Sequence, residues 1–279
     1  MAASVLDPDT HLAHVNTAAE AVRALLSDRP RIGIIADPVT EPLVEEMTSA
    51  TAIDFADVPH LPAPGETDAH RFIAGELWEQ DVLVVPHALH LYEGISARES
   101  ALPVRIMGAL GIETLIATAA AGSVNPHYTP GEVMLLADHI NLQGANPLEG
   151  PNVDAWGPRF PDMSNPYDPA LREVAHQAAL RAGERLQEGI YLGVPGPNTQ
   201  TKTEYRFMRH VGADAVGTGL IPEVIAARHM DLRVLAAVVI TDACFADTLE
   251  PTSAAEVAQA AETGRARLKQ VLTHLMPRL

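Results

Sequence analysis

The 279-residue chain has one cysteine and few positive charges, and each scarcity excludes a class of protein. With Cys244 alone, no disulfide can form within the chain, so a disulfide-stapled extracellular domain is excluded and an intracellular compartment is the default. A lone cysteine is usually a small buried apolar residue, and we interpret Cys244 in that way. The formal net charge of -17 would repel a polyphosphate backbone or an anionic lipid surface, so we expect no nucleic-acid or membrane partner.

Long apolar runs are missing as well. No stretch approaches the ~18 consecutive apolar residues of a membrane span, and the N-terminal segment MAASVLDPDTHLAHV lacks the basic start and apolar run of a signal peptide. We therefore expect a soluble protein of the cytoplasm. None of the 12 histidines forms an H-x-x-x-H pair or has a cysteine partner nearby, so we expect no metal site.

Short apolar runs alternate with amphipathic segments along the whole chain. The strand-like runs are IGIIAD, DVLVVPH, TLIATAAAG, VMLLADHI, IYLGVPG and VLAAVVITD. Several are too continuously apolar to have a solvent face, which is typical of strands covered on both sides by helices. Helices are expected between them, with an N-terminal helix over about residues 11–28 and a C-terminal helix over about residues 254–276. The alternation predicts an α/β fold: a single domain, residues 1–279, with three α/β/α layers and a mixed, largely parallel central sheet.

Polar residues follow several of the expected strands. In open α/β sheets ligands bind beyond the carboxyl ends of the strands. Here those ends carry Asp37, His87, His90, Asp138, His139, residues 198–200 and Asp242. They predict a small-molecule pocket, although an Asp or Asn after a strand often serves only as a turn or helix cap. The segment 141–169, rich in Pro and Asn, is a long loop of the kind that is usually functional.

Seven motifs are more specific than this general pattern. They are HLYEG, AAAGS, DHINL, NPLEGPN, RFPDMSNPYD, GPNTQTKTE and GADAVGTGLIPEVIAARH. In this order and spacing, over roughly residues 30–275, they resemble the trimeric purine nucleoside phosphorylase and methylthioadenosine phosphorylase family. The resemblance implies a nucleoside phosphorylase-like fold, a homotrimer, and cleavage of the bond between a purine and C1′ of ribose. It implies no cofactor, with phosphate as a possible co-substrate and a purine nucleoside as the small-molecule partner.

For the purine, the resemblance assigns Gln200 and Asp242 as the residues that hold the base. Gln200 stands where guanosine-type and inosine-type members have a glutamate, so the charge that pairs with N1–H is missing. Asp242 stands where those members have an asparagine and resembles the methylthioadenosine branch, in which a carboxylate accepts from a 6-amino group and, when protonated, donates to N7. We therefore favour a 6-aminopurine. Thr199 stands where relatives have a phenylalanine over the base, which removes aromatic stacking.

For the ribose, the resemblance assigns Tyr92 to a sugar hydroxyl and His90 to the position two residues before it. Thr218 stands in place of a methionine under the ribose. Ala254 stands in place of a histidine that contacts the 5′-hydroxyl, so the 5′ pocket would suit a modified 5′ end. Phe160 matches an aromatic residue that a neighbouring subunit lends, so the trimer would complete the site. The remaining expected substrate contacts are Ala120, Ala121, Gly122 and Gly217.

The phosphate-binding positions are where this sequence departs from the family. Pro38 stands where relatives have a serine, Ala88 where they have an arginine, and Gly219 where they have a second serine. The position of the family's phosphate histidine falls near Asp68. Loss of these groups together with the addition of Asp37 and Asp68 should reverse the local electrostatic potential.

Three functions remain open. In the first, which we favour, the protein is a nucleosidase that uses water as the acceptor, with Asp37, Asp68 or His90 as the general base. In the second, it is a phosphorylase that holds phosphate with residues outside the usual positions. The candidates for that role are His70, Arg71, His87 and Thr40. In the third, it binds a purine or nucleoside without catalysis. The residues expected to act in catalysis are Asp242, Gln200, His90, Asp37 and Asp68.

Overall fold

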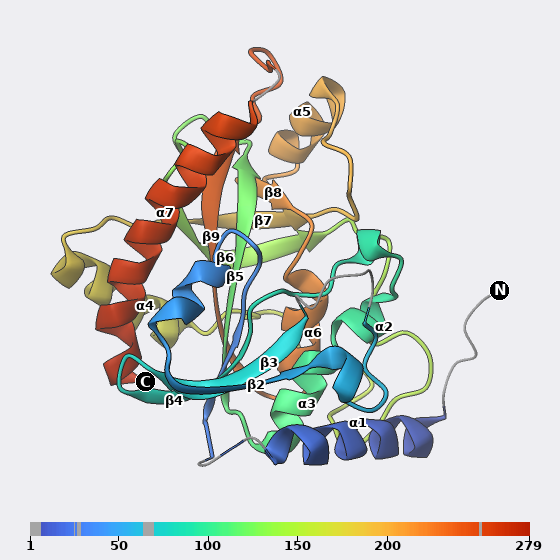
Figure 1. The fold of residues 1–279 in the computed structure, drawn as a ribbon. Coiled ribbons are helices and arrows are strands. Elements are labelled where there is room, and N and C mark those ends of the chain that lie inside the picture. The colour runs from blue at the N-terminus through green and yellow to red at the C-terminus, as the bar shows by residue number, and fades with distance from the viewer. Residues whose placement is uncertain (1–6, 25, 27–28, 64–69, 251–252) are drawn as a thin grey trace.

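The computed structural model describes residues 7–279 apart from 25, 27–28, 64–69 and 251–252 (Figure 1). Its strands are β1 (Ile32–Ile35), β2 (Thr48–Asp54), β3 (Arg71–Leu77), β4 (Gln80–Val85), β5 (Thr114–Ser123), β6 (Val133–Asn141), β7 (Gln187–Gly193), β8 (Ala215–Gly217) and β9 (Arg233–Ala243). Its helices are α1 (Pro8–Arg23), α2 (Ala97–Ser100), α3 (Leu102–Leu110), α4 (Pro169–Ala182), α5 (Lys202–His210), α6 (Ile221–His229) and α7 (Ala254–Leu275). Short 3₁₀ segments are η1 (Glu41–Glu46), η2 (Phe55–Asp57), η3 (Leu91–Glu93) and η4 (Met276–Arg278).

The strands form one mixed sheet in the order β2-β3-β4-β1-β5-β8-β7-β6-β9, and β9 pairs back onto β5. The five strands β5, β8, β7, β6 and β9 therefore close into a ring, while β2, β3, β4 and β1 extend from it as an open sheet. The central pairings of β1 with β4 and of β5 with β1 and β9 are parallel. The predicted single-domain α/β class with a mixed, largely parallel sheet is confirmed, and the closure of half of the sheet is a feature that the prediction did not contain.

Helices cover both faces of this sheet, as Figure 1 shows, and each face has its own apolar core. Residues of α1, α3 and α6 form one buried cluster with β4, β5 and β9, and residues of α4 and α7 form the second cluster with the opposite faces of β1, β6 and β9. Val85, Leu115, Val234 and Val238 have no exposed surface. Burial on both faces explains why these strands are continuously apolar in the sequence.

Local capping signals set the ends of the helices. The side chain of Asp7 accepts from the Thr10 backbone and Pro8 occupies the first turn, so α1 begins at residue 8, where the sequence suggested a helix over about residues 11–28. Ser253 and Glu256 form a capping box at the start of α7. The segment 142–168 contains neither helix nor strand, in agreement with the long loop expected there. None of the helices in the described part of the chain combines the length and apolarity that a membrane span requires.

A buried glutamate ties α6 to the segment that precedes η3. Glu223 is 2% exposed, its Oε1 lies 2.6 Å from Ser100 Oγ, and Ser100 Oγ donates to the Leu89 carbonyl at 2.9 Å. Burial raises the pKa of Glu223 to about 7. When Glu223 is protonated, its carboxyl group donates to Ser100 Oγ and leaves the serine hydrogen for Leu89, while Oε2 has no hydrogen-bond partner among the described residues. The residue that follows Leu89 is His90, so these hydrogen bonds hold the backbone next to a candidate site residue.

We predict that the protein loses stability as the pH rises through about 7 because of Glu223. The folded-state pKa lies above the ordinary value of 4.5, so the stabilising contribution is complete below pH 4.5 and is lost as the pH rises through about 7. In Glu223→Gln the amide replaces the protonated carboxyl, and the loss, on the order of 2–3 kcal/mol, should disappear. Urea denaturation at pH 5 and pH 8.5 measures it, with the exposed Glu262→Gln as control. Equal pH dependence in both variants would contradict the role of Glu223.

Candidate active site

The polar residues that follow the central strands meet at one edge of the sheet. Because β1 is parallel to β4 and β5, and β9 is parallel to β5, the carboxyl ends of these four strands lie together. Asp37 follows β1 and His90 follows β4. Residues 120–122 lie near the C-terminal end of β5, and Asp242 lies near the C-terminal end of β9. The expected site residues on these four strands are therefore brought to one place, as the general rule for α/β sheets predicts.

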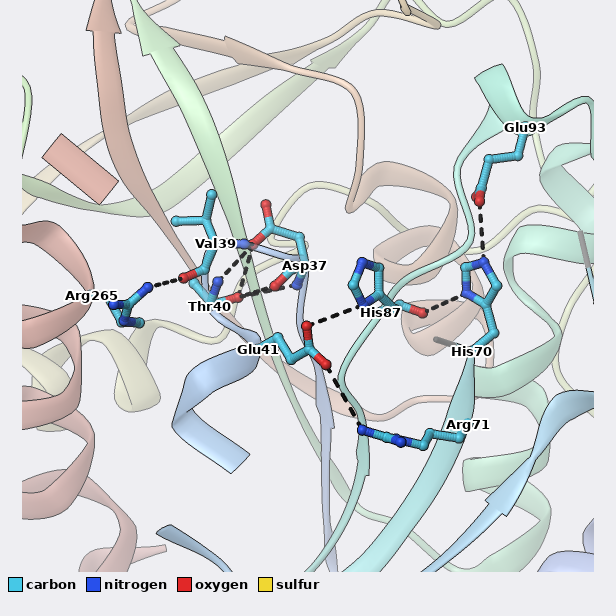
Figure 2. Close-up of polar contacts among 9 residues, drawn as sticks. All are labelled: Asp37, Val39, Thr40, Glu41, His70, Arg71, His87, Glu93 and Arg265. Carbon is cyan, nitrogen blue, oxygen red and sulfur yellow. Dashed lines mark hydrogen bonds and ion pairs between the residues drawn. The ribbon is translucent and has the colours of Figure 1, made fainter. Parts of the chain in front are cut away.

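Asp37 is buried, and its carboxylate is held by hydrogen bonds from its own chain (Figure 2). Oδ1 accepts from the backbone N–H groups of Val39 at 3.1 Å and Thr40 at 3.0 Å, and from Thr40 Oγ1 at 3.0 Å. Oδ2 accepts from the backbone N–H of Ala120 in β5 at 2.5 Å. Backbone N–H groups that converge in this way form an anion-binding nest, and here the anion is a side chain of the protein.

The backbone hydrogen bonds to the Asp37 carboxylate favour its ionised form. Thr40 Oγ1 accepts from the Asp37 backbone N–H at 3.1 Å and from the Thr118 hydroxyl at 2.9 Å, and its own hydrogen can be donated to the Asp37 carboxylate at 3.0 Å or to the Asp37 carbonyl at 3.3 Å. The three backbone N–H partners of the carboxylate are donors in either case, and they stabilise the ionised form. Burial raises the pKa of Asp37, and these donors act against that rise.

The basic side chains beside this nest lie near carboxylates (Figure 2). His87 Nδ1 lies 3.4 Å from Glu41 Oε2, and an Arg71 Nη atom lies 4.0 Å from Glu41 Oε1. His70 Nε2 lies 3.1 Å from Glu93 Oε1. These are side chains that a rebuilt phosphate site would use, and each has an acidic neighbour, although His87 Nδ1 and Arg71 Nε have no hydrogen-bond partner among the described residues. Ala88, at the position of the family's arginine, is buried and apolar.

His90 is buried and has a free ring nitrogen. The ring stacks on Tyr92 with 4.8 Å between centroids and an interplanar angle of 10°, and within the described residues Nδ1 has no hydrogen-bond partner. Burial lowers the pKa of His90, although Glu93 and Asp37 oppose that change, so the ring is neutral at pH 7. A Cβ at Gly219 would lie 3.2 Å from His90 Cε1. The missing side chain at residue 219 therefore gives the ring its space.

Tyr92 and Thr218 approach each other at Gly196. A Cβ on Gly196 would lie 2.8 Å from Thr218 Cγ2 and 3.2 Å from Tyr92 Cδ1, so both side chains border the same backbone. Gln143 Nε2 donates to the Thr218 carbonyl at 2.9 Å, and Gln143 is buried. Gln143 was not expected from the sequence. It directly follows the DHINL motif and lies near the start of the loop 141–169, which was expected to be functional.

Asp242 has both carboxylate oxygens hydrogen-bonded from within the chain. Oδ1 accepts from Thr241 Oγ1 at 2.8 Å, and Oδ2 accepts from Cys244 Sγ at 2.9 Å. Gly122 pairs with Asp242 across the β5–β9 ladder, and a Cβ there would lie 3.0 Å from Asp242 Oδ2 and 2.6 Å from Cys244 Sγ. Gln200 is half-buried before α5 and donates to the Asn198 carbonyl at 3.1 Å, while Thr199 is exposed.

The remaining expected contacts lie elsewhere or within the sheet. Phe160 is 87% exposed and borders a cavity of about 450 Å³ with His139 and Asn141, which none of the residues above lines. Ala254 is exposed at the first position of α7. Asp68 lies outside the described residues. The last group is Ala120, Ala121, Gly122 and Gly217, which belong to the paired strands β5 and β8. Within the described ranges no cluster of His, Cys, Asp or Glu has the arrangement of a metal site.

Comparison with known proteins agrees with this fold. The model described as the phosphorylase superfamily matches residues 31–277. Purine nucleoside phosphorylase 1 of Bacillus subtilis is 38% identical over 253 residues, which cover 90% of this chain and 93% of that protein. Bovine purine nucleoside phosphorylase is 39% identical over 258 residues, which cover 89% of each chain.

Solved structures give the same result. Isoform 2 of purine nucleoside phosphorylase from Schistosoma mansoni, in complex with cytosine and ribose-1-phosphate, superimposes with a TM-score of 0.90 at 31% identity over 96% of both chains. A Schistosoma mansoni purine nucleoside phosphorylase in complex with adenosine gives a TM-score of 0.89 at 31% identity, over 96% of this chain and 97% of that one. The chain therefore belongs to the purine nucleoside phosphorylase family of the phosphorylase superfamily.

We predict that Asp37→Asn lowers the free energy of unfolding by about 2–4 kcal/mol, because the amide NH₂ would face the N–H of Ala120 or the N–H groups of the turn. Chemical denaturation measures this change. Asp81→Asn, at an exposed position of β4, is the control and should change stability by less than about 0.5 kcal/mol. An Asp37→Asn protein as stable as wild type would show that the nest does not require an anion.

Proposed function

We propose that this protein cleaves the N-glycosidic bond of a purine nucleoside, prefers a 6-aminopurine, and uses water as the acceptor. The observation that carries the choice of acceptor is the Asp37 carboxylate, which fills the nest made by residues 39, 40 and 120. A phosphate ion would have to displace a buried carboxylate that is already hydrogen-bonded, and it would meet that negative charge at short range.

In the proposed reaction the electron pair of the C1′–N9 bond leaves with the purine, and the sugar develops positive charge at C1′. The fixed charge of Asp37 stabilises that cation without reorganisation of the site. Neutral His90, with Nδ1 free, accepts a proton from the attacking water as the new O–C1′ bond forms. The departing purine takes up a proton from solvent water at N7, and protonated His90 returns its proton to solvent, so the products are free ribose and a neutral purine.

The purine is assigned to the Asp242 and Gln200 side of the site. The Asp242 oxygens already accept from Thr241 and Cys244 and retain lone pairs for a ligand. A carboxylate that accepts two further hydrogen bonds suits the 6-amino group and the N7–H of the departing purine, which N7 acquires as the C1′–N9 bond breaks. The carbonyl of a 6-oxopurine would place an acceptor against it.

Phosphorolysis is the second candidate, because the similar proteins from bacteria and mammals are named phosphorylases and one Schistosoma structure holds ribose-1-phosphate. The contacts of this chain count against it. Arg71 and His87 share Glu41, and His70 faces Glu93, so a phosphate would compete with carboxylates for these side chains.

The assembly and location belong to the same proposal. We propose a homotrimer in which Phe160, exposed on the single chain, closes the 5′ side of a neighbour's site. A cytoplasmic location remains a prediction from the sequence. A noncatalytic purine or nucleoside binder is the third function, and it predicts binding without release of base.

The acceptor is tested by base release from adenosine, inosine and 5′-modified adenosines, in phosphate-free buffer and with added phosphate, with the sugar product identified. We expect release without phosphate, free ribose as the product, and a higher kcat/KM for the 6-amino substrates. A strict requirement for phosphate with ribose 1-phosphate as the product would establish the second candidate. Binding of nucleoside with no release under either condition would establish the third.

We predict that His90 sets the acid limb of the pH profile. Because its pKa lies below 6.5, kcat/KM should be level near neutral pH and fall as the pH drops through that pKa. His90→Gln should lower kcat by about 10²–10⁴-fold, the usual size of a general-base contribution, and remove the acid limb. The exposed His127→Gln is the matched control and should keep both. An acid limb that persists in His90→Gln would assign the base to another group.

A further inference from the structure

The hydrogen bonds to Asp242 fix the direction in which its carboxylate points. Thr241 Oγ1 lies 2.8 Å from Oδ1 and Cys244 Sγ lies 2.9 Å from Oδ2, so one donor from the chain holds each oxygen. A carboxylate oxygen accepts about two hydrogen bonds, which leaves each oxygen with capacity for one more. The group therefore presents two adjacent acceptors, and their orientation depends on Thr241 and Cys244.

Cys244 packs beside Tyr205 of α5. The two residues belong to one buried cluster and line the same pocket. Burial raises the pKa of Cys244 to about 12, so the thiol keeps its hydrogen and acts as a donor at neutral pH.

The surroundings of the Cys244 thiol distinguish a hydrogen-bond donor from a side chain that only fills apolar space. Cys244 and Tyr205 belong to a buried apolar cluster with Val124, Leu192 and Val194. The sulfur nevertheless points at the carboxylate, and the absence of a side chain at Gly122 gives it room, because a Cβ there would lie 2.6 Å from Sγ. The S–H group has a polar partner at the place where the ligand would bind.

We propose that Cys244 and Tyr205 are positioning residues for base recognition: they orient the Asp242 carboxylate so that it accepts two neighbouring N–H groups of a 6-aminopurine. This inference rests on the proposed function and extends it. Removal of the thiol frees the carboxylate to rotate, which weakens a ligand that needs both oxygens at fixed angles. A ligand that offers one donor to that edge is less affected.

The test is calorimetric binding of adenine and hypoxanthine to the full-length protein and to variants at residues 244 and 205. We expect wild type to favour adenine, and Cys244→Ala to lose about tenfold in adenine affinity, the value of one hydrogen bond to a charged group, with hypoxanthine changed by less than about twofold. Cys244→Ser keeps a donor and should recover adenine affinity to within about threefold of wild type. Tyr205→Phe, which leaves the thiol in place, should fall between the two.

The outcomes that overturn the inference are separate from those that overturn the proposed function. Equal losses for both bases in Cys244→Ala, or no recovery in Cys244→Ser, would show that Cys244 acts through packing alone. If Cys244→Ala does not fold, Cys244→Ser and Tyr205→Phe carry the comparison, and unchanged adenine selectivity in Tyr205→Phe contradicts the role of that residue. Failure of the wild type to bind either base would overturn the proposed function, and the inference with it. Thr248→Ala, at an exposed position beyond Cys244, is the control.

Discussion

The arrangement of this site depends on one buried carboxylate. Asp37 joins the turn after β1 to the C-terminal part of β5 by hydrogen bonds. A buried charge is tolerated only while its donors stay in place. That requirement fixes the turn at residues 37–40, directs the Ala120 N–H inward, and sets a negative charge beside neutral His90. The electrostatic character of the acceptor side is therefore built into the fold and is not supplied by a diffusible ion.

The two carboxylates of the site differ in how much of their hydrogen-bonding capacity the chain uses. Asp37 accepts four hydrogen bonds from the chain, and Asp242 accepts two. The first is therefore nearly saturated and contributes its charge, while the second still has acceptors to offer a ligand. Under the proposed function, Asp37 serves as a fixed ion and Asp242 as a recognition group, and the number of donors around each carboxylate makes the difference.

The sequence predicted the class of fold because strands buried on both faces leave a continuous apolar signature, as β5 and β9 do. It did not predict that β9 returns to β5, since periodicity identifies a strand but not its partners. In the site, the contacts of Asp37 with residues 39 and 40 follow the local pattern of an Asx turn. Its contact with Ala120, 83 residues away, needed the structure. Cys244 was interpreted as an apolar residue, and it is buried, but its hydrogen bond to Asp242 depends on side-chain directions that the sequence does not contain.

Asp242 and Asp37 lie on different halves of the sheet, the closed ring and the open extension. Asp242 lies on a strand that is paired on one side to β5 and on the other to β6, within a ring of five strands that has no free edge. Asp37 follows β1 on the side of the open sheet, whose last strand, β2, is largely exposed. Under the proposed function, changes in the loops of the open half would alter the molecule that attacks the sugar, while the ring would keep the contacts to the base. A protein built on this sheet would then gain a new acceptor without losing its purine.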